Sequence, residues 1–345
     1  MTTPVVLFVA AAAMGWIAGY PLARARWAAT TPRLAVALWH SLSFGVVSSV
    51  VLGGLALAAP MLPQMVTSGL SDLLERCAMT LRAGLAAPGS AALGLGLAGM
   101  VVGVSMLARL LACLAVVARR ARRARRAQLR VLALVARRLQ GDQGDRLLLL
   151  LLDDERPAAY CLPGSRARGG DTIVVSSGAL DLLDDSQVRL VLAHERAHLR
   201  QRHHLATLIS ATLAAAFGWV PLFRLAAQHV PPLLEMAADD QAIRQSAVRS
   251  VVPSPPATAA RRRLAQAVVT LATAPTPAPT AVLAAAGGSA LARVHRLIQP
   301  PQRLSIARTT LLSIGVTTAF GGPLLVASAP ALCAAAMQIC PFVFA

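Results

Sequence analysis

The chain has 345 residues, of which 56% are hydrophobic, and its formal net charge is +18. Together with a mean hydropathy of +0.61, this composition excludes an ordinary soluble globular protein and indicates a membrane protein. The basic residues are all Arg. Arg clusters beside apolar runs are typical of the cytoplasmic ends of membrane spans and of contact with anionic lipids.

Four apolar runs are long enough to cross the hydrocarbon core of a bilayer as helices. They cover residues 4–23, 34–62, 91–118 and 309–332. Because Arg residues follow the first run rather than precede it, an uncleaved anchor is favoured over a signal peptide. Arg residues also follow the third run, so we expect the loops after spans one and three to be cytoplasmic and both chain termini to be extracytoplasmic. Residues 1–118 are thus predicted to hold three spans, and residues 309–345 a fourth span with a short extracytoplasmic tail.

The remaining segment, residues 119–308, is predicted to form one cytoplasmic α+β domain. Short apolar runs separated by Pro and Gly indicate three strands, at residues 146–154, 158–164 and 171–180. Asp184 followed by Gln187 predicts the start of a helix through a capping box, and apolar residues continue beyond it at helical spacing.

This predicted helix carries the motif H-E-x-x-H, formed by His194, Glu195 and His198. Two His residues four positions apart lie on one helix face, so both imidazoles can bind a single metal ion. Catalysis by such a site needs neutral imidazole ligands, an open position for water, and a carboxylate that accepts the proton of that water. A charged, solvated helix face is the alternative interpretation, since a five-residue pattern also occurs by chance.

A third metal ligand can come from a second predicted helix, which begins at Pro231 and carries two carboxylates four positions apart, Glu235 and Asp239. One carboxylate would bind the metal, and the other would accept a hydrogen bond from a ligand imidazole and so fix its orientation. Such a pair most often belongs to a solvated helix face, but the upstream H-E-x-x-H favours a metal site.

Residues 159–204, together with the segment "LLEMAADDQA" at residues 233–242, resemble the BlaR/MecR-type family of membrane-embedded zinc metallopeptidases, and more distantly HtpX and the CAAX prenyl proteases. The resemblance implies an α-helical multipass membrane protein with an inserted α+β gluzincin-like zinc peptidase domain. It also implies the following roles: one Zn²⁺ per chain bound by His194, His198 and Glu235, Glu195 as catalytic base, and Asp239 as partner of a ligand imidazole. No penicillin-binding sensor segment follows the last span in this sequence, so sensing of β-lactams is not expected.

Two segments near the motif have open interpretations. The strand of Tyr160, Cys161 and Leu162 is either a substrate-binding edge that pairs with an extended peptide or simply the edge of a sheet. The apolar run 206–223 could span a membrane, but a single crossing would separate Glu235 from the two imidazoles, and too few residues follow for a helix to cross back. We therefore expect a helix that dips into or lies along the cytoplasmic leaflet, with a buried core helix of the domain as the alternative.

The sequence favours an integral-membrane zinc-dependent endopeptidase that cleaves a cytoplasmic or membrane-associated protein. A transcriptional repressor in a signalling pathway is one candidate substrate, and a quality-control role of HtpX character is an alternative. A non-catalytic membrane sensor or scaffold with a structural metal site is the other class, and an intact Glu195 argues against it. The expected partners are a protein or peptide substrate and membrane lipids. Direct nucleic-acid binding is not expected, because the Arg cluster 119–130 adjoins a membrane span and lacks interleaved aromatic residues.

Overall fold

The computed structural model describes residues 2–58, 90–139, 147–164, 170–248, 257–274, 290–299 and 304–339. This part of the chain is mostly helical and contains one four-stranded sheet. Within it, four helical stretches are long and apolar enough to cross a membrane: Thr2–Ala23, Pro32–Ala58, Gly94–Val135 and Ile306–Pro330. These stretches coincide with the four predicted spans and support a multipass membrane protein. The loop predicted between spans two and three lies outside the described residues.

Helix α3 (Pro32–Ala58) is at the centre of the spanning part and contacts each of the other three spans. Pro32 occupies its first turn, where the missing N–H would have no helical partner anyway. The first span, which packs on α3, consists of three consecutive segments: α1 (Thr2–Ala12), the π-helical η1 (Ala13–Ala18) and α2 (Gly19–Ala23). The third span approaches α3 closely at paired glycines, since a Cβ on Gly54 would lie 2.5 Å from the carbonyl oxygen of Gly99.

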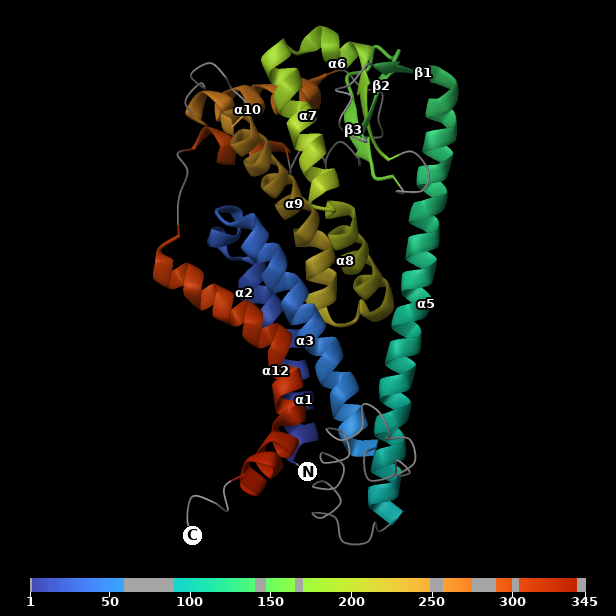
Figure 1. The fold of residues 1–345 in the computed structure, drawn as a ribbon, viewed down its shortest axis with the longest axis vertical. Coiled ribbons are helices and arrows are strands. Elements are labelled where there is room, and N and C mark those ends of the chain that lie inside the picture. The colour runs from blue at the N-terminus through green and yellow to red at the C-terminus, as the bar shows by residue number, and fades with distance from the viewer. Residues whose placement is uncertain are drawn as a thin grey trace.

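Helix α5 (Ser90–Val135) is 46 residues long and continues without interruption through the Arg cluster 119–130. The helix therefore does not end at residue 118, where we predicted the end of the third span. Beyond Gly103 this helix contains no Gly or Pro, and it is rich in Ala, Leu and Arg, which have high helix propensity. Figure 1 shows α5 along one side of the molecule, where it connects the spanning part with the sheet.

The four strands of the sheet are β1 (Ala136–Leu139), β2 (Leu147–Leu152), β3 (Ala159–Leu162) and β4 (Asp171–Ser176). Their order is β1-β2-β4-β3, with β2 and β4 parallel and the outer pairs antiparallel. β3 is therefore an edge strand, as predicted, whereas β1 was not predicted. β4 ends earlier than predicted because the Ser176 hydroxyl caps the short helix α6 (Ser177–Leu182) and accepts a hydrogen bond from the Ala179 N–H.

Helix α7 (Asp185–Arg200) begins at the predicted capping box. The Asp184 carboxylate accepts hydrogen bonds from the N–H groups of Ser186 and Gln187, and the Gln187 side chain accepts one from the Asp184 N–H. Leu199 on this helix is buried against the sheet. The cap and the buried side of the helix together fix the direction in which the H-E-x-x-H face points.

The apolar run 206–223 does not form one helix, which corrects that prediction. It is divided between α8 (His203–Phe217) and α9 (Pro221–Val248). Gly218 has low helix propensity and follows the first helix, and Pro221 fits the first turn of the second. Helix α9 thus begins well before Pro231, where we predicted its start, and Pro231 lies inside it.

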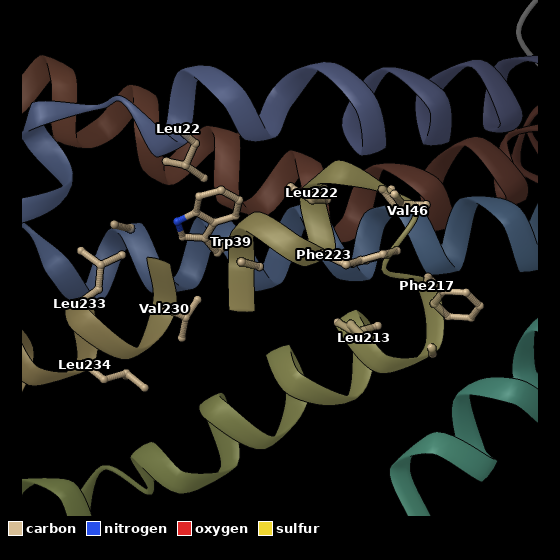
Figure 2. Packing of buried hydrophobic residues seen from close by; sticks show 14 of the residues in the cluster. Leu22, Trp39, Val46, Leu213, Phe217, Leu222, Phe223, Val230, Leu233 and Leu234 are labelled. Carbon is tan, nitrogen blue, oxygen red and sulfur yellow. The ribbon is translucent and has the colours of Figure 1, made fainter. Parts of the chain in front are cut away.

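Helices α8 and α9 form a hairpin that contacts α5 on one side and α3 on the other (Figure 1). Figure 2 shows the core that results, in which Trp39 of α3 lies among Leu222, Phe223 and Val230 of α9. The chain therefore returns to the side from which it entered, so Glu235 lies on the same side as the two imidazoles. The depth of this hairpin in a membrane stays a prediction.

Two ionisable side chains inside the spans bind backbone carbonyl groups of this hairpin. Arg109 of α5 donates from Nε to the carbonyl oxygen of Ala216 at 2.6 Å, and its guanidinium lies 5.0 Å from the ring centroid of Trp219. Nε2 of His40 on α3 lies 3.2 Å from the carbonyl oxygen of Ala206. Both side chains thus hold α8 in place. This role explains why the spans contain ionisable groups, although burying such groups in a membrane costs free energy.

The remaining helices complete the fold. Helix α10 (Ala257–Thr273) packs on α7 and α9, and Leu297, on a helix of residues 290–298, is buried in the same cluster as Leu264 of α10. Helix α12 (Ile306–Ile339) packs on α3. Helix α1 begins and α12 ends at the end of the molecule opposite the sheet (Figure 1).

Candidate metal centre

Helices α7 and α9 bring together the three predicted metal ligands. Nε2 of His194 lies 3.3 Å from Oε2 of Glu235, and Nε2 of His198 lies 3.3 Å from Oε1 of the same carboxylate. The two Nε2 atoms are 3.1 Å apart. The three side chains, which come from two helices, therefore converge on one point.

This geometry fits a tetrahedral divalent ion. Ligand atoms bound to zinc at about 2.0–2.1 Å with tetrahedral angles lie about 3.3 Å from one another, which is close to the distances among these three side chains. Two imidazole nitrogens and one carboxylate oxygen are also the donor set of catalytic zinc sites, which leave a fourth position for water. The residues present thus fit the zinc ion that the sequence predicted.

Asp239 lies one helical turn after Glu235 on α9 and is fully buried. Its Oδ1 atom lies 2.9 Å from Nδ1 of His194. When Nε2 of His194 binds a metal, Nδ1 must carry the ring proton, so the carboxylate of Asp239 selects that tautomer and fixes the direction of the ring. The structure places Asp239 where the sequence predicted a partner for a ligand imidazole.

Arg293 completes this carboxylate network, although its sequence position gave it no predicted role. Its Nε and Nη2 atoms donate to the two oxygens of Asp239 at 2.9 and 2.7 Å, and its Nη1 lies 3.1 Å from Oε2 of Glu235. The neighbouring Arg296 pairs with Asp240 at 2.7 Å. The sequence offered one signal for these ion pairs: Asp239 and Asp240 are adjacent, and Arg293 and Arg296 are one helical turn apart.

His203 makes the corresponding contact with the second ligand. Its Nδ1 lies 3.0 Å from Nδ1 of His198, and its Nε2 lies 3.2 Å from Oε1 of Gln201. If Nε2 of His198 binds a metal, its Nδ1–H donates a hydrogen bond to Nδ1 of His203, and Nε2–H of His203 then donates one to Oε1 of Gln201. One set of tautomers satisfies both contacts. A left-handed residue, Arg202, with φ of 51°, precedes α8 and turns the chain so that His203 faces α7.

The predicted catalytic base, Glu195, lies against the edge strand. Its carboxylate accepts a hydrogen bond from the thiol of Cys161 on β3. Burial raises the pKa of Glu195, and the neighbouring His194 opposes this shift. Burial and the Glu195 carboxylate raise the pKa of the Cys161 thiol, so it stays protonated. A carboxylate with a raised pKa is suited both to accept a proton and to release it.

The three residues predicted to bind substrate differ in their surroundings. Cys161 packs on the side of the sheet that faces α7 and Glu195. Tyr160 and Leu162 point to the opposite face, where they pack in a cluster with Leu132 of α5. The alternation of side chains along a strand produces this division. Only the main chain of β3 and the Cys161 side chain, among these three residues, are therefore directed toward the candidate site.

The charges of the three ligands depend on one another. Burial acts against the charged form of His194, but the carboxylates of Asp239 and Glu235 outweigh it and raise its pKa to about 9. Burial lowers the pKa of His198 to about 4. Burial also acts against ionised Glu235, but His194, the other imidazole and the nearby guanidinium lower its pKa to about 2. Without metal at neutral pH, the site thus holds one imidazolium, one neutral imidazole and a carboxylate.

Comparison with known proteins gives a match to the central segment of the chain. A family model described as Peptidase family M48 matches residues 121–231. The matched segment includes the H-E-x-x-H helix and ends before Glu235, so the third ligand depends on the structure described above. No solved structure matches the chain.

Three relatives, each described as a protease HtpX homolog, are similar over short segments. The protein of Aquifex aeolicus (strain VF5) is 36% identical over 72 residues, which are 21% of this chain and 23% of that protein. The protein of Acidiphilium cryptum (strain JF-5) is 34% identical over 70 residues, 20% and 24% of the two chains. That of Salinibacter ruber (strain DSM 13855 / M31) is 31% identical over 75 residues, 22% and 26%. The chain thus matches about a quarter of the length of these relatives. The HtpX resemblance is supported, and the BlaR/MecR-type resemblance stays a prediction.

Proposed function

We propose that this chain is a membrane-embedded zinc endopeptidase of the M48 type, since its segment 121–231 matches that peptidase family and contains the H-E-x-x-H helix. The observation that carries the proposal is the convergence of His194, His198 and Glu235 on one point, beside the half-buried carboxylate of Glu195. Structural zinc sites use four protein ligands and need no base, whereas catalytic sites use three and keep a position for water. Three ligands and a base therefore support an enzyme over a scaffold.

The residues of the site have separate tasks in peptide hydrolysis. Zinc, when bound, supplies the Lewis acidity that activates a water molecule and polarises the carbonyl group of the scissile bond. Glu195 accepts the proton of the attacking water and passes it to the amine that leaves. Asp239 orients His194, and His203 orients His198, so both ligands keep their direction throughout the reaction.

The edge strand β3 is the proposed binding surface for the substrate main chain. An extended peptide can pair with the free N–H and C=O groups of an edge strand, a common mode of peptide recognition. Cys161 is the residue of β3 that contacts Glu195. A peptide paired along β3 would therefore present its scissile bond opposite Cys161, between the strand and the metal centre.

We propose a cytoplasmic peptidase part and extracytoplasmic termini, with the metal centre close to the membrane. The hairpin of α8 and α9, which carries Glu235, packs directly on the first three spans. This position supports substrates that are membrane-associated or lie near the membrane. The HtpX relatives favour a quality-control protease acting on membrane proteins. Cleavage of a transcriptional repressor in a signalling pathway is the second candidate, and the BlaR/MecR-type resemblance favours it.

The test of the peptidase is the substitution Glu195→Gln in the full chain. The variant keeps the three ligands, so its zinc content should equal that of the wild type, while cleavage of a protein substrate such as casein should slow by about 10²–10⁴-fold. Glu155→Gln makes the same chemical change at an exposed position and is the control. Equal cleavage rates in the wild type and Glu195→Gln would contradict the proposal.

The two candidate roles can be separated by comparing the protein fragments in cells that carry the wild type or Glu195→Gln. Fragments of many membrane proteins that disappear in the variant indicate quality control. A single cytoplasmic DNA-binding protein that stays intact in the variant indicates repressor cleavage.

A further inference from the structure

A cavity of about 590 Å³ lies beside the metal centre, between α5 and α8. Its wall includes the metal ligands His198 and Glu235, and also Cys161 and Pro163 at β3. A peptide that paired with β3 and placed its scissile bond at the metal would therefore direct a neighbouring side chain into this cavity. The chemistry of the wall then determines which side chain fits.

The wall has an apolar part and a basic part. Arg122 and Arg125 of α5 line the basic part, and His204 of α8, whose pKa is lowered by burial and by Arg125, lies beside them. Helix α5 leads from the spans to the sheet (Figure 1), so these Arg residues lie on the sheet side of the apolar part. The apolar part is formed by residues closer to the spans: Val117, Ala118, Leu208 and Ala211.

The basic part lacks a matching acidic group in the wall. Among the described residues that line the cavity, Glu235 is the one carboxylate, and it belongs to the metal centre. Asp171 acts electrostatically on Arg125 from the start of β4, but its Oδ1 accepts a hydrogen bond from the Gly164 N–H at 2.8 Å. Arg125 is half-buried and Arg122 is exposed one turn before it, and burial together with the nearby Arg122 lowers the pKa of Arg125. Such a pair favours an anionic ligand.

We propose that Arg122 and Arg125 select substrates with an acidic side chain next to the scissile bond and apolar side chains toward the membrane spans. A guanidinium binds a carboxylate through a planar, bidentate contact, which discriminates Glu and Asp from the neutral amides of the same shape. This inference rests on the proposed peptidase function and specifies its substrate class. A peptide accounts for the whole wall, since a lipid head group would use the Arg residues but not His198 or Cys161.

The test uses the zinc-loaded full chain in non-ionic detergent and a set of fluorogenic apolar peptides. The peptides are identical except for one Glu, Gln or Lys, placed in turn at each position around the bond that is cleaved. The wild type should cleave the best-placed Glu peptide about tenfold faster than its Gln counterpart, and the Lys peptide more slowly still. The double variant Arg122→Glu/Arg125→Glu should invert this order at the same position.

Arg123→Glu/Arg126→Glu is the matched control, because these exposed residues lie on the same helix, do not line the cavity and change the charge by the same amount. The control should keep the wild-type preference. The ratio of the cleavage rates of two peptides is independent of the amount of active enzyme. If the charge-reversed variant does not fold, Arg122→Gln/Arg125→Gln is the second variant, and it should abolish the preference.

Three outcomes would overturn the acidic preference, and a fourth would reject the peptidase on which it rests. Equal cleavage of the Glu, Gln and Lys peptides by an active wild type rejects the acidic preference but leaves the peptidase intact. If the charge-reversed variant keeps the preference for the Glu peptide, residues other than Arg122 and Arg125 cause that preference. If charge reversal instead slows all peptides equally, and only when anionic lipid vesicles are added, the Arg pair binds lipid. A wild type that binds zinc but cleaves no peptide or casein rejects the peptidase proposal itself.

Discussion

Nδ1 of His198 lies 3.0 Å from Nδ1 of His203, so one of the proposed metal ligands is oriented by another imidazole. The other ligand, His194, has the carboxylate of Asp239 at its Nδ1. A carboxylate accepts hydrogen bonds at either of its two oxygens, whereas an imidazole accepts one at Nδ1 only when the ring is neutral and carries its proton on Nε2. Gln201 selects this tautomer, and burial, which lowers the pKa of His203 to about 4, keeps the ring neutral.

We expect His203→Ala to weaken zinc binding about 10–100-fold, the usual effect of losing the partner of a ligand imidazole. His203→Asp should recover most of the affinity, because its carboxylate also accepts a hydrogen bond from Nδ1–H of His198. Competition with a chromophoric chelator measures both affinities. His295→Ala, at an exposed position, is the control for the loss of an imidazole. If His203→Ala binds zinc as tightly as the wild type, the contact does not orient the ligand.

The parts of the site that the sequence predicted are those fixed by local geometry. The capping box at Asp184 sets where α7 begins, and the spacing of four residues then puts His194 and His198 on one face whatever the tertiary fold. The same spacing joins Glu235 and Asp239 on α9. To predict that the two side chains of each pair lie together, it was enough to predict a helix. To predict that both pairs belong to one site, it was enough to know which donor atoms zinc requires.

The parts that could not be predicted depend on contacts between distant segments. Arg293 reaches Asp239 only because its helix packs against the cluster of α7 and α10, which no local pattern specifies. His203 faces its partner because Arg202 adopts a left-handed conformation that few residues other than Gly favour. Pro221 and Pro231 are both suitable first residues of a helix. Helix α9 begins at Pro221 because Phe223 and its neighbours are buried against α3.

Arg293→Gln should destabilise the metal-free protein by about 3 kcal/mol, the lower end of the cost of breaking a buried ion pair, because the fully buried Asp239 would lose its guanidinium partner and keep only His194. The loss should also change the response to acid. A carboxyl group with a lowered folded pKa stabilises the fold above its unfolded pKa, and this contribution disappears as the pH falls through the folded value. For Glu235, whose pKa falls from 4.5 to about 2, that interval is pH 4.5 to 2.

The pKa of Asp239 is lowered as well, against its burial, by His194 and Arg293. Without the guanidinium both carboxyl groups move back toward their ordinary pKa values, so the variant should lose less stability than the wild type between pH 5 and 2. Thermal unfolding midpoints across this range measure the difference. Arg296→Gln removes the neighbouring pair with Asp240 and is the control. Arg296→Gln should lower the unfolding midpoint but keep the acid response of the wild type. If the midpoints of both variants depend on pH in the same way, Arg293 does not lower the pKa values of Asp239 and Glu235.

Zinc binding at neutral pH should release about one proton, because His194 is protonated in the metal-free site and must be neutral to bind metal. Between pH 5 and 8 the zinc affinity should therefore rise about tenfold per pH unit, and the rise should level off near pH 9. His198, with a pKa of about 4, contributes no proton in this range. Calorimetry in two buffers with different ionisation enthalpies counts the protons released. Asp239→Asn removes the principal group that raises the pKa of His194, so this variant should release fewer protons, and an unchanged count would contradict the assignment.

The contact of Arg109 with the tip of the α8–α9 hairpin should stabilise the position of the metal centre. Its Nε is 2.6 Å from the carbonyl oxygen of Ala216 at the end of α8, and its guanidinium lies over Trp219. Arg109→Leu leaves this carbonyl without its partner, which should cost about 1–3 kcal/mol and lower the thermal midpoint. Arg109→Lys should recover only part of the loss, because an ammonium lacks the planar group that both donates to the carbonyl and stacks on the ring.

Hydrogen exchange should locate this effect in the hairpin. Residues of α8 and the first turns of α9 should exchange faster in Arg109→Leu than in the wild type, while the sheet should remain unchanged, since the hairpin tip packs on the spans and not on the strands. Arg119→Leu, at an exposed position on the same helix, is the control and should leave exchange in the hairpin unaltered. Because α9 also carries Glu235, faster exchange should be accompanied by weaker zinc binding. A hairpin that exchanges faster with unchanged zinc affinity would mean that the metal centre holds its geometry independently of the tip.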